Sequence, residues 1–237
     1  MSTPYYVSPE QIMQDKADFV RTGIERAKEV IVLEYKDGIV MVAENPLTTL
    51  FKISEIYDRI ALAATGRIAE YEALRYLGIR EAEIKGYTFN RADVTAKWLT
   101  NNIFSQRIAA IFWQTDTKPL EVELLLCELR ADPDSSHRIY QLSFDGTFWE
   151  EQKYAIIGGR SDEISEILEG AYEDGLELKD AVKLAVNGFE TIEAKADEDQ
   201  RYHISADTLE VAVLDENRNR RKFRRLLPDE LEEILAS

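Results

Sequence analysis

The stretch VIVLEYKDGIVMVA, residues 30–43, decides the fold, because two apolar runs flank an Asp-Gly pair in it. Asp37-Gly38 supplies the positive φ angles of a tight hairpin turn, and the β-branched residues on either side favour strands. Both runs are apolar at nearly every position, whereas a strand with one face in water alternates apolar and polar residues. We therefore expect a hairpin whose two strands are covered on both faces.

Blocks of strands and pairs of helices follow this hairpin. Strands are expected over residues 50–56, 60–64, 122–129, 139–144, 154–157 and 209–214 and around Phe223. Helices are expected over residues 67–76, over 93–113 with Asp93 as N-cap, after Ser161, over 181–192 and after Pro228. Strands that are apolar on both faces need cover on both sides. The pattern predicts an α+β fold, a four-layer αββα sandwich forming one domain over residues 8–237.

An extra helix is expected at the N-terminus, over residues 8–28. Ser8-Pro9-Glu10-Gln11 combines a capping Ser, a Pro at the first helical position and a Gln two residues further on, which is typical of a helix start. One apolar stripe follows, formed by Met13, Ala17, Val20, Ile24 and Ala27. A single stripe predicts a helix that lies on the rest of the molecule. Residues 1–7 have no periodicity and are expected to be a short flexible tail.

Charge and composition exclude several classes of protein. The 237 residues include 45 acidic and 29 basic side chains, a net charge of −16, whereas a nucleic-acid binder needs a surplus of Lys and Arg. One cysteine and two histidines cannot form an internal disulfide, a cysteine zinc site or a His-rich metal centre, so no metal or cofactor is expected. No apolar run reaches the roughly 18 residues that cross a bilayer, and the N-terminus lacks the layout of a signal peptide. We expect a cytoplasmic protein.

Three candidate sites for chemistry have simpler structural explanations. Gly158-Gly159 precedes a predicted helix and could hold a phosphate, but neither glycine-rich nucleotide motif is present, so a tight turn is favoured. Cys127 lies in an apolar strand, where a thiol behaves as a small hydrophobic group, and no histidine is recognisable as its partner by spacing. A pair of hydrolytic carboxylates is compatible with the sequence, but 45 acidic residues make proximity uninformative.

Two basic features each allow two interpretations. Residues 218–225 hold the one basic cluster of an acidic chain, which fits either a charged edge strand or a surface that docks on an acidic neighbour. Lys52 interrupts an apolar strand, so it is either the solvent-facing position of that strand or a pocket lysine that binds the C-terminal carboxylate of a partner.

Several segments, in this order and spacing, resemble the α subunit of the 20S proteasome, in the bacterial type found in actinobacteria. They are YYVSPEQ (5–11), GIERAK (23–28), VAENP (42–46), KISEIYDR (52–59), RADV (91–94), YQLSFDG (140–146) and LEVAVLD (209–215). The segments extend over nearly the whole chain, and the element order above matches the αββα sandwich of that family.

The resemblance implies a non-catalytic subunit. In the related β subunits, an N-terminal Thr opens the first strand and acts as nucleophile, its own amine serves as base, and a lysine of a neighbouring strand tunes the site. Here the place of that Thr is taken by about Lys28, with chain ahead of it, and the place of the lysine falls at about Thr49. We therefore expect no catalytic residues in this chain.

The resemblance also implies a structural and regulatory role. Seven such subunits would form each outer ring of a four-ring barrel, cap the β rings that contain the threonine protease sites, and admit unfolded substrates in regulated, ATP-dependent degradation of tagged proteins. Lys52, with Gly66 beside Thr65, matches the pocket between α subunits that receives the C-terminus of a ring-shaped activator such as the proteasomal ATPase. The gate would be the tail: Ser2, Thr3, Pro4, Tyr5, Tyr6 and Val7.

Two other functions are compatible with the sequence. The chain could be a self-contained N-terminal-nucleophile hydrolase that uses Ser2 after removal of Met1, although a nucleophile on a flexible tail is not held near a base. It could also be an interaction scaffold without a proteolytic partner. Neither nucleic acid nor a membrane is expected as a partner.

Overall fold

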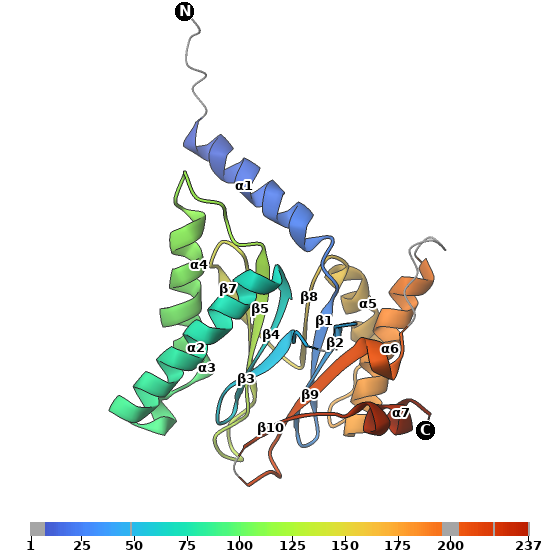
Figure 1. Cartoon of the computed structure of the whole chain (residues 1–237). Coiled ribbons are helices and arrows are strands. Elements are labelled where there is room, and N and C mark those ends of the chain that lie inside the picture. Colours follow the sequence, from blue (N-terminus) through green and yellow to red (C-terminus); the bar gives the residue numbers. More distant parts are fainter. Residues whose placement is uncertain (1–7, 48, 196–203, 220, 237) are drawn as a thin grey trace, which may run out of the picture.

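A computed structural model of the chain describes residues 8–47, 49–195, 204–219 and 221–236. Two five-stranded antiparallel sheets are stacked face to face, and helices cover the outer face of each (Figure 1). The predicted four-layer αββα sandwich is therefore confirmed, and the predicted N-terminal helix is present. The gate residues Ser2 to Val7 lie outside the described residues.

Each sheet is built mainly from hairpins. The first sheet has the order β10 (Phe223–Arg225), β9 (Leu209–Asp215), β2 (Gly38–Glu44), β1 (Val30–Tyr35) and β8 (Tyr154–Ile157). The second has the order β3 (Ile53–Tyr57), β4 (Ile60–Gly66), β5 (Val122–Glu128), β6 (Arg138–Leu142) and β7 (Phe148–Glu151). β1 and β2 pair from Val30 opposite Ala43 to Tyr35 opposite Gly38, which confirms the predicted hairpin.

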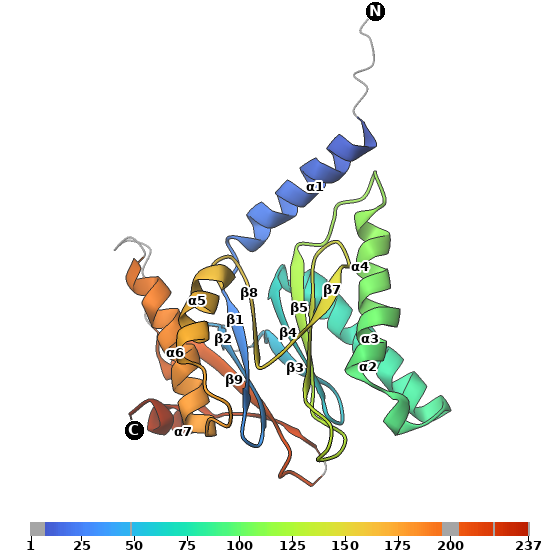
Figure 2. The same ribbon diagram turned by 180° about the vertical axis from the view of Figure 1, so that it is seen from behind.

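Three hydrophobic cores, one on the outer face of each sheet and one between the sheets, explain why the central strands are apolar on both faces. The first sheet packs on α5 (Ser161–Ala171), α6 (Leu178–Lys195) and α7 (Pro228–Ala236). The second packs on α2 (Ile68–Thr88), α3 (Ala96–Leu99) and α4 (Ser105–Phe112) (Figure 2). Between the sheets lies a third cluster of apolar side chains, which includes Val32, Met41 and Leu125, all fully buried. Every residue of β2 is buried as a result.

Helix α1 (Pro9–Ile24) is shorter than the predicted 8–28. Ser8 is its N-cap, and its side chain accepts a hydrogen bond from the N–H of Gln11 at 3.2 Å. Val20 and Ile24 pack with Phe112 and Phe144, so the predicted stripe faces the body. The helix ends because the following residues form a turn that leads the chain into β1.

The helices of the second layer depart most from the prediction. α2 continues twelve residues beyond residue 76, to Thr88, because its buried stripe continues through Gly78 and Ala82, small residues that give a weak apolar signal. The expected helix 93–113 is interrupted: a short 3-10 helix η1 (Arg91–Asp93) precedes α3, and a π-helical segment η2 (Thr100–Phe104) joins α3 to α4. Thr95 is the N-cap of α3, instead of Asp93, since its hydroxyl accepts from the N–H of Trp98. Another 3-10 turn, η4 (Ala206–Thr208), precedes β9.

Candidate functional site

Residues 25–29, here called the joint, connect α1 to β1 at one end of the sandwich (Figure 1). The main-chain carbonyl oxygen of Lys28 accepts two hydrogen bonds, from Nζ of Lys52 and from Oγ1 of Thr65, each at 2.7 Å. Lys52 precedes β3 and Thr65 lies in β4, so both donors come from the second sheet. The second sheet therefore holds the entry to the first strand of the first sheet.

A charged network surrounds the joint on its other side. Nζ of Lys28 lies 2.8 Å from Glu44 on β2 and 3.2 Å from Glu193 on α6. Arg160 contacts Glu29 at 3.1 Å and Glu193 at 2.5 Å. Burial disfavours the charged form of Lys28, but the hydrogen bonds and charges of Glu44 and Glu193 outweigh it and raise the pKa of Lys28. The joint is thus fixed by ion pairs to β2 and α6.

Lys52 differs from Lys28 and Arg160, because its ammonium donates to a main-chain carbonyl instead of a glutamate carboxylate. The N–H of Lys52 donates to the carboxylate of Glu210 at 2.8 Å, which holds its main chain in place. No carboxylate oxygen of the described residues lies within ion-pair distance of its Nζ, which is half-buried and bonded to the carbonyl oxygen of Lys28. Burial lowers the pKa of Lys52 to about 8, and the charges of Glu29, Glu44 and Glu210 oppose that shift. This ammonium has N–H groups left for an incoming anion.

Gly66 lies close to Lys52 at the end of the neighbouring strand. The N–H of Ala64 donates to the carbonyl of Lys52 at 2.9 Å, which sets these strand ends side by side. Gly66 has a φ of +104°, and a Cβ there would lie 2.0 Å from the carbonyl oxygen of Glu121. Only glycine fits this close approach of two backbones. The fold therefore brings the two residues of the predicted pocket to the same end of the neighbouring strands β3 and β4.

The catalytic parts of a threonine protease are arranged differently from the expectation. Lys28 lies between α1 and β1, so its main-chain nitrogen is part of a peptide bond and cannot act as a free amine. Thr49, the expected place of the lysine, is exposed, and the side chain that reaches the joint is that of Lys52. A lysine is therefore present beside the first strand, and the nucleophile and its amine are missing from that place.

The remaining candidates of the sequence have structural roles. Cys127 is fully buried between the sheets, and burial raises the pKa of its thiol. Gly159 lies against the joint, where a Cβ would be 2.4 Å from the carbonyl oxygen of Glu25, so the double glycine is a tight turn that the joint packs against. Among the described residues, no group of three or more His, Cys, Asp or Glu side chains could hold a metal ion.

The basic cluster forms ion pairs within the chain. Arg221 contacts Glu55 at 2.5 Å, Arg224 contacts Glu230 at 2.8 Å, and Arg225 pairs with Glu210. β10 is the edge strand of its sheet, and Glu55 lies on β3 of the other sheet. These contacts favour the edge-strand interpretation over docking on a neighbour. Arg220 lies outside the part of the chain that the structure describes.

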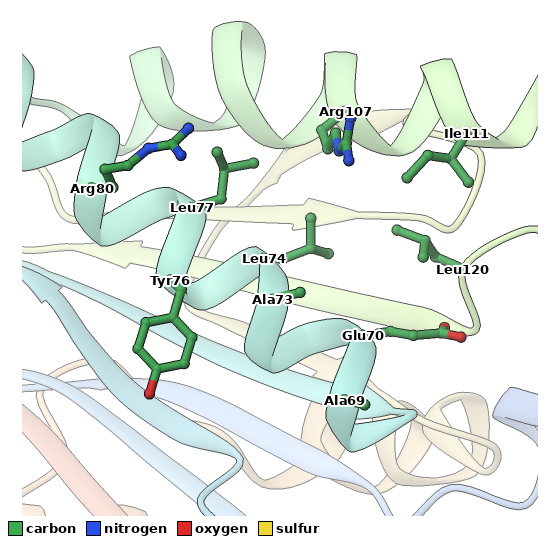
Figure 3. Close-up of a pocket in the computed structure, with 10 residues that line it drawn as sticks. All are labelled: Ala69, Glu70, Ala73, Leu74, Tyr76, Leu77, Arg80, Arg107, Ile111 and Leu120. Atoms are coloured by element: carbon green, nitrogen blue, oxygen red, sulfur yellow. The ribbon is translucent and has the colours of Figure 1, made fainter.

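An apolar groove of about 810 Å³ lies between α2 and α4 (Figure 3). Leu74, Leu77 and Ile111 line it, and Arg80 and Arg107 lie along one side. Large apolar side chains are exposed on the same layer, among them Tyr76, Tyr87 and Phe89. Exposed apolar surface of this kind is typical of a protein that contacts others.

Comparison with known proteins identifies a family for this chain. The proteasome subunit family matches residues 24–214. The chain is 47% identical over 236 residues to proteasome subunit alpha of Thermomonospora curvata, covering 100% of this chain and 99% of the relative. It is 46% identical over 237 residues to that of Nocardioides sp. and 44% identical over 238 residues to that of Streptomyces coelicolor, covering 90% and 91% of those relatives.

The chain belongs to the proteasome subunit alpha family. As a proteasome α subunit, it is a non-catalytic component of the protease complex. The lysine beside its first strand is thus not part of a peptidase site. Ser2, the nucleophile of the alternative function, lies outside the described residues. No helix in the described parts of this α subunit is long and apolar enough to cross a membrane.

Proposed function

We propose that this α subunit forms the heptameric outer rings of the 20S core, gates entry to the β rings and docks a ring-shaped ATPase through its pocket at Lys52 and Gly66. The observation that carries the proposal is the half-buried ammonium of Lys52 at a strand edge, which is bonded to a main-chain carbonyl and has no carboxylate at ion-pair distance among the described residues. A C-terminal carboxylate is an anion that such a group can bind.

Pocket geometry supports a small anionic group as the ligand. Gly66 lets the main chain of Glu121 pass close to the end of β4, which fixes the strand end beside Lys52. Lys28, Arg160 and Arg225, which lie at the same end, are already paired with glutamates. Lys52 therefore offers a positive charge that forms no ion pair with the described residues, and its position at a strand end fixes where a carboxylate binds.

Helix α1 supports the proposed gate and ring. Its apolar stripe packs on the body, whereas Phe19 on another face is 49% exposed. Nζ of Lys16 donates to the carbonyls of Phe112 and Thr117 at 3.2 and 2.9 Å, which fixes the direction of the helix. A neighbouring α1 that covers Phe19 would bury this apolar surface, and residues 2–7 would then extend from each helix toward a common axis as the gate.

The proposed partners of the chain are identical α subunits and β subunits, and its proposed location is the cytoplasm. The groove between α2 and α4 supports an assembled state with identical α subunits and with β subunits, because isolated chains rarely leave such surface exposed (Figure 3). Unfolded, tagged proteins would pass through the ring in ATP-dependent degradation. The acidic composition suits a cytoplasmic protein that binds neither nucleic acid nor a membrane.

The pocket is tested with the Lys52→Ala variant in particles reconstituted with the β subunit of the same host. We expect the fourteen-plus-fourteen particle to assemble and ATPase-stimulated degradation of an unfolded protein to be lost. Lys36→Ala is the matched control, since Lys36 is an exposed lysine at the other end of β1 that pairs with Glu177. Stimulation of the Lys52→Ala particle equal to that of the control would exclude the pocket.

The gate is tested by deleting residues 2–7 in the same particle. Basal hydrolysis of a fluorogenic peptide is expected to rise, because the tail no longer blocks the axial opening. The measurement is the peptidase rate without activator, normalised to the amount of particle by native mass spectrometry. An unchanged rate would mean that these residues do not close the channel.

A further inference from the structure

The fold gives the ammonium of Lys52 few groups that stabilise its charge. Its Nζ donates to one acceptor of the described residues, the carbonyl oxygen of Lys28 at 2.7 Å, and no carboxylate among them lies within ion-pair distance. Lys28, in contrast, has two glutamates at its ammonium, and Lys16 donates to three main-chain carbonyls. The fold therefore retains the proton of Lys52 less firmly than the protons of Lys16 and Lys28.

Burial acts on Lys52 in the same direction. An ammonium that is withdrawn from water loses part of its hydration, which favours the neutral amine. Burial lowers the pKa of Lys52 to about 8 against the opposing charges of Glu29, Glu44 and Glu210, whereas the hydrogen bond to its glutamate raises the pKa of the exposed Lys36. At neutral pH, the fraction of Lys52 in the amine form is therefore about a hundredfold larger than for an ordinary lysine.

The hydrogen bond to Lys28 also orients the amine. A neutral amine has two N–H groups and one lone pair, and one N–H of Lys52 continues to donate to the Lys28 carbonyl. Oγ1 of the fully buried Thr65 is a second donor to this carbonyl, which keeps the acceptor in place. Because the carbonyl occupies one side of the nitrogen, the lone pair is directed away from it. A desolvated lysine of this kind is an activated nucleophile.

We propose that Lys52 is a site of covalent acylation by acyl phosphates, and that its acylation switches off the docking of an activator at this α subunit. The consequence for docking rests on the proposed function, whereas the reactivity of the lysine does not. An acyl phosphate suits this place because it is small and carries the negative charge that the ammonium form of Lys52 attracts.

The step transfers an acyl group from oxygen to nitrogen. The lone pair of the amine forms a bond to the acyl carbon, the bond between that carbon and the phosphate oxygen breaks, and the phosphate leaves with the electron pair. The proton that the nitrogen loses goes to the phosphate. The product is a neutral amide, which keeps an N–H for the carbonyl of Lys28 but has no charge for a carboxylate. Acylation therefore removes the docking group and spares the joint.

The reactivity is tested by comparing lysines within one sample of the reconstituted wild-type particle. The particle is treated with acetyl phosphate, and peptide mass spectrometry follows the acetylation of Lys52 and of Lys36, an exposed lysine that pairs with Glu177. We expect Lys52 to react about tenfold faster at pH 7.5, because its larger amine fraction outweighs its lower basicity. From pH 7 to pH 9, the rate at Lys52 is expected to level off while the rate at Lys36 continues to rise. Equal rates at the two lysines would overturn the proposal.

The effect on docking is tested with a short peptide that has the free C-terminus of the host's proteasomal ATPase. We expect this peptide to protect Lys52 from acetyl phosphate, whereas the same peptide with a C-terminal amide gives no protection. Treatment of the wild-type particle is expected to abolish binding of the free-acid peptide. Lys52→Arg has no amine to acetylate, so treatment should leave its affinity unchanged, whatever the absolute value.

Two outcomes separate the modification from the docking function. If treated wild type has acetylated Lys52 and still binds the free-acid peptide, acylation does not regulate docking and the proposal is overturned. If Lys52→Ala binds that peptide as tightly as untreated wild type, the docking function itself is wrong, and faster acetylation of Lys52 than of Lys36 would still establish the reactive lysine.

Discussion

The two ends of the sandwich both contain buried charged clusters, but the clusters differ in how fully they are paired. At the end with the joint, Lys28, Arg160 and Arg225 each contact a glutamate, and Lys52 contacts a main-chain carbonyl. At the far end, the loops after β5 and β9 bring together Arg130, His137 and Glu216. Each end therefore combines carboxylates with cations, but only the cluster at the joint includes an ammonium, that of Lys52, whose acceptor among the described residues is a carbonyl instead of a carboxylate.

The far-end cluster is closed on itself. Arg130 contacts Glu216 at 2.5 Å, and the main-chain N–H of Arg130 donates to Nδ1 of His137 at 3.2 Å. Nε2 of His137 then carries the proton and points toward Glu216 at 3.6 Å. Because each of these three groups has a partner in the same cluster, the cluster stabilises its loops, whereas the ammonium of Lys52 is bonded to a carbonyl and forms no ion pair with the described residues. A buried charge with an incomplete set of partners is the better guide to function.

The largest expected effect comes from breaking the pairing at the joint end. Glu210 accepts hydrogen bonds from Asn45 at 2.7 Å, from the N–H of Lys52 at 2.8 Å and from the N–H of Ile53 at 3.1 Å, and it pairs with Arg225. Glu210→Ala leaves these donors without their acceptor, and we expect a loss of about 3–5 kcal/mol in the free energy of unfolding. The urea midpoint of the purified chain measures it.

A matched substitution at the surface sharpens that result. Glu177→Ala removes one exposed carboxylate that pairs with the exposed Lys36, and we expect a change in stability of less than about 1 kcal/mol. If Glu210→Ala costs no more than Glu177→Ala, the Glu210 carboxylate does not organise the strand edge that holds Lys52.

The sequence predicts the parts of the fold that depend on near neighbours. The hairpin at Asp37-Gly38 and the helix start at Ser8 follow from local turn and cap chemistry, and both are confirmed. The length of α2 does not follow, because Gly78 and Ala82 continue its buried stripe without a strong apolar signal. The start of an element can be predicted from local sequence more readily than its end, because tertiary packing decides how far the element continues.

The candidate site is predictable from the sequence only in part. Lys52 is recognisable in the sequence as a polar residue in an apolar strand, and the buried Glu44 and Glu210 show the same pattern. Thr65 and Glu193 carry no comparable signal, because the chain brings them to Lys28 from 37 and 165 residues away. The joint is a product of tertiary structure, so its partners become visible only in the fold.

The second prediction concerns the protonation of Lys52. Since its pKa is about 8, most of the side chain is charged at pH 7 and most of it is neutral at pH 9. Only the ammonium binds a carboxylate well, so we expect the affinity for a short peptide with the free C-terminus of the host's proteasomal ATPase to fall about tenfold between these pH values. Fluorescence anisotropy of the labelled peptide on the assembled particle measures the profile.

An arginine at the same position is the control for this profile. Lys52→Arg stays charged throughout this range, so its affinity for the peptide, whatever its absolute value, is expected to be the same at pH 7 and pH 9. A profile of the wild-type particle that is as flat as that of Lys52→Arg would contradict a Lys52 ammonium that titrates near pH 8.

The smallest expected effect lies at the far end and concerns stability at low pH. Burial lowers the pKa of His137, while Glu216 opposes and Arg130 adds to that shift, so the unfolded chain takes up a proton before the folded one does as pH falls. The contribution of His137 to stability is therefore complete above its ordinary pKa of about 6.5 and is lost as the pH falls below it.

His137→Asn keeps an acceptor for the N–H of Arg130 and does not titrate, so its urea midpoint should fall less than that of wild type between pH 7.5 and pH 5.5. His137→Gln displaces that acceptor and should cost about 1 kcal/mol at both pH values. Equal pH dependence in wild type and His137→Asn would mean that this histidine does not link the far-end cluster to pH, and the contrast between the two ends would then rest on the joint alone.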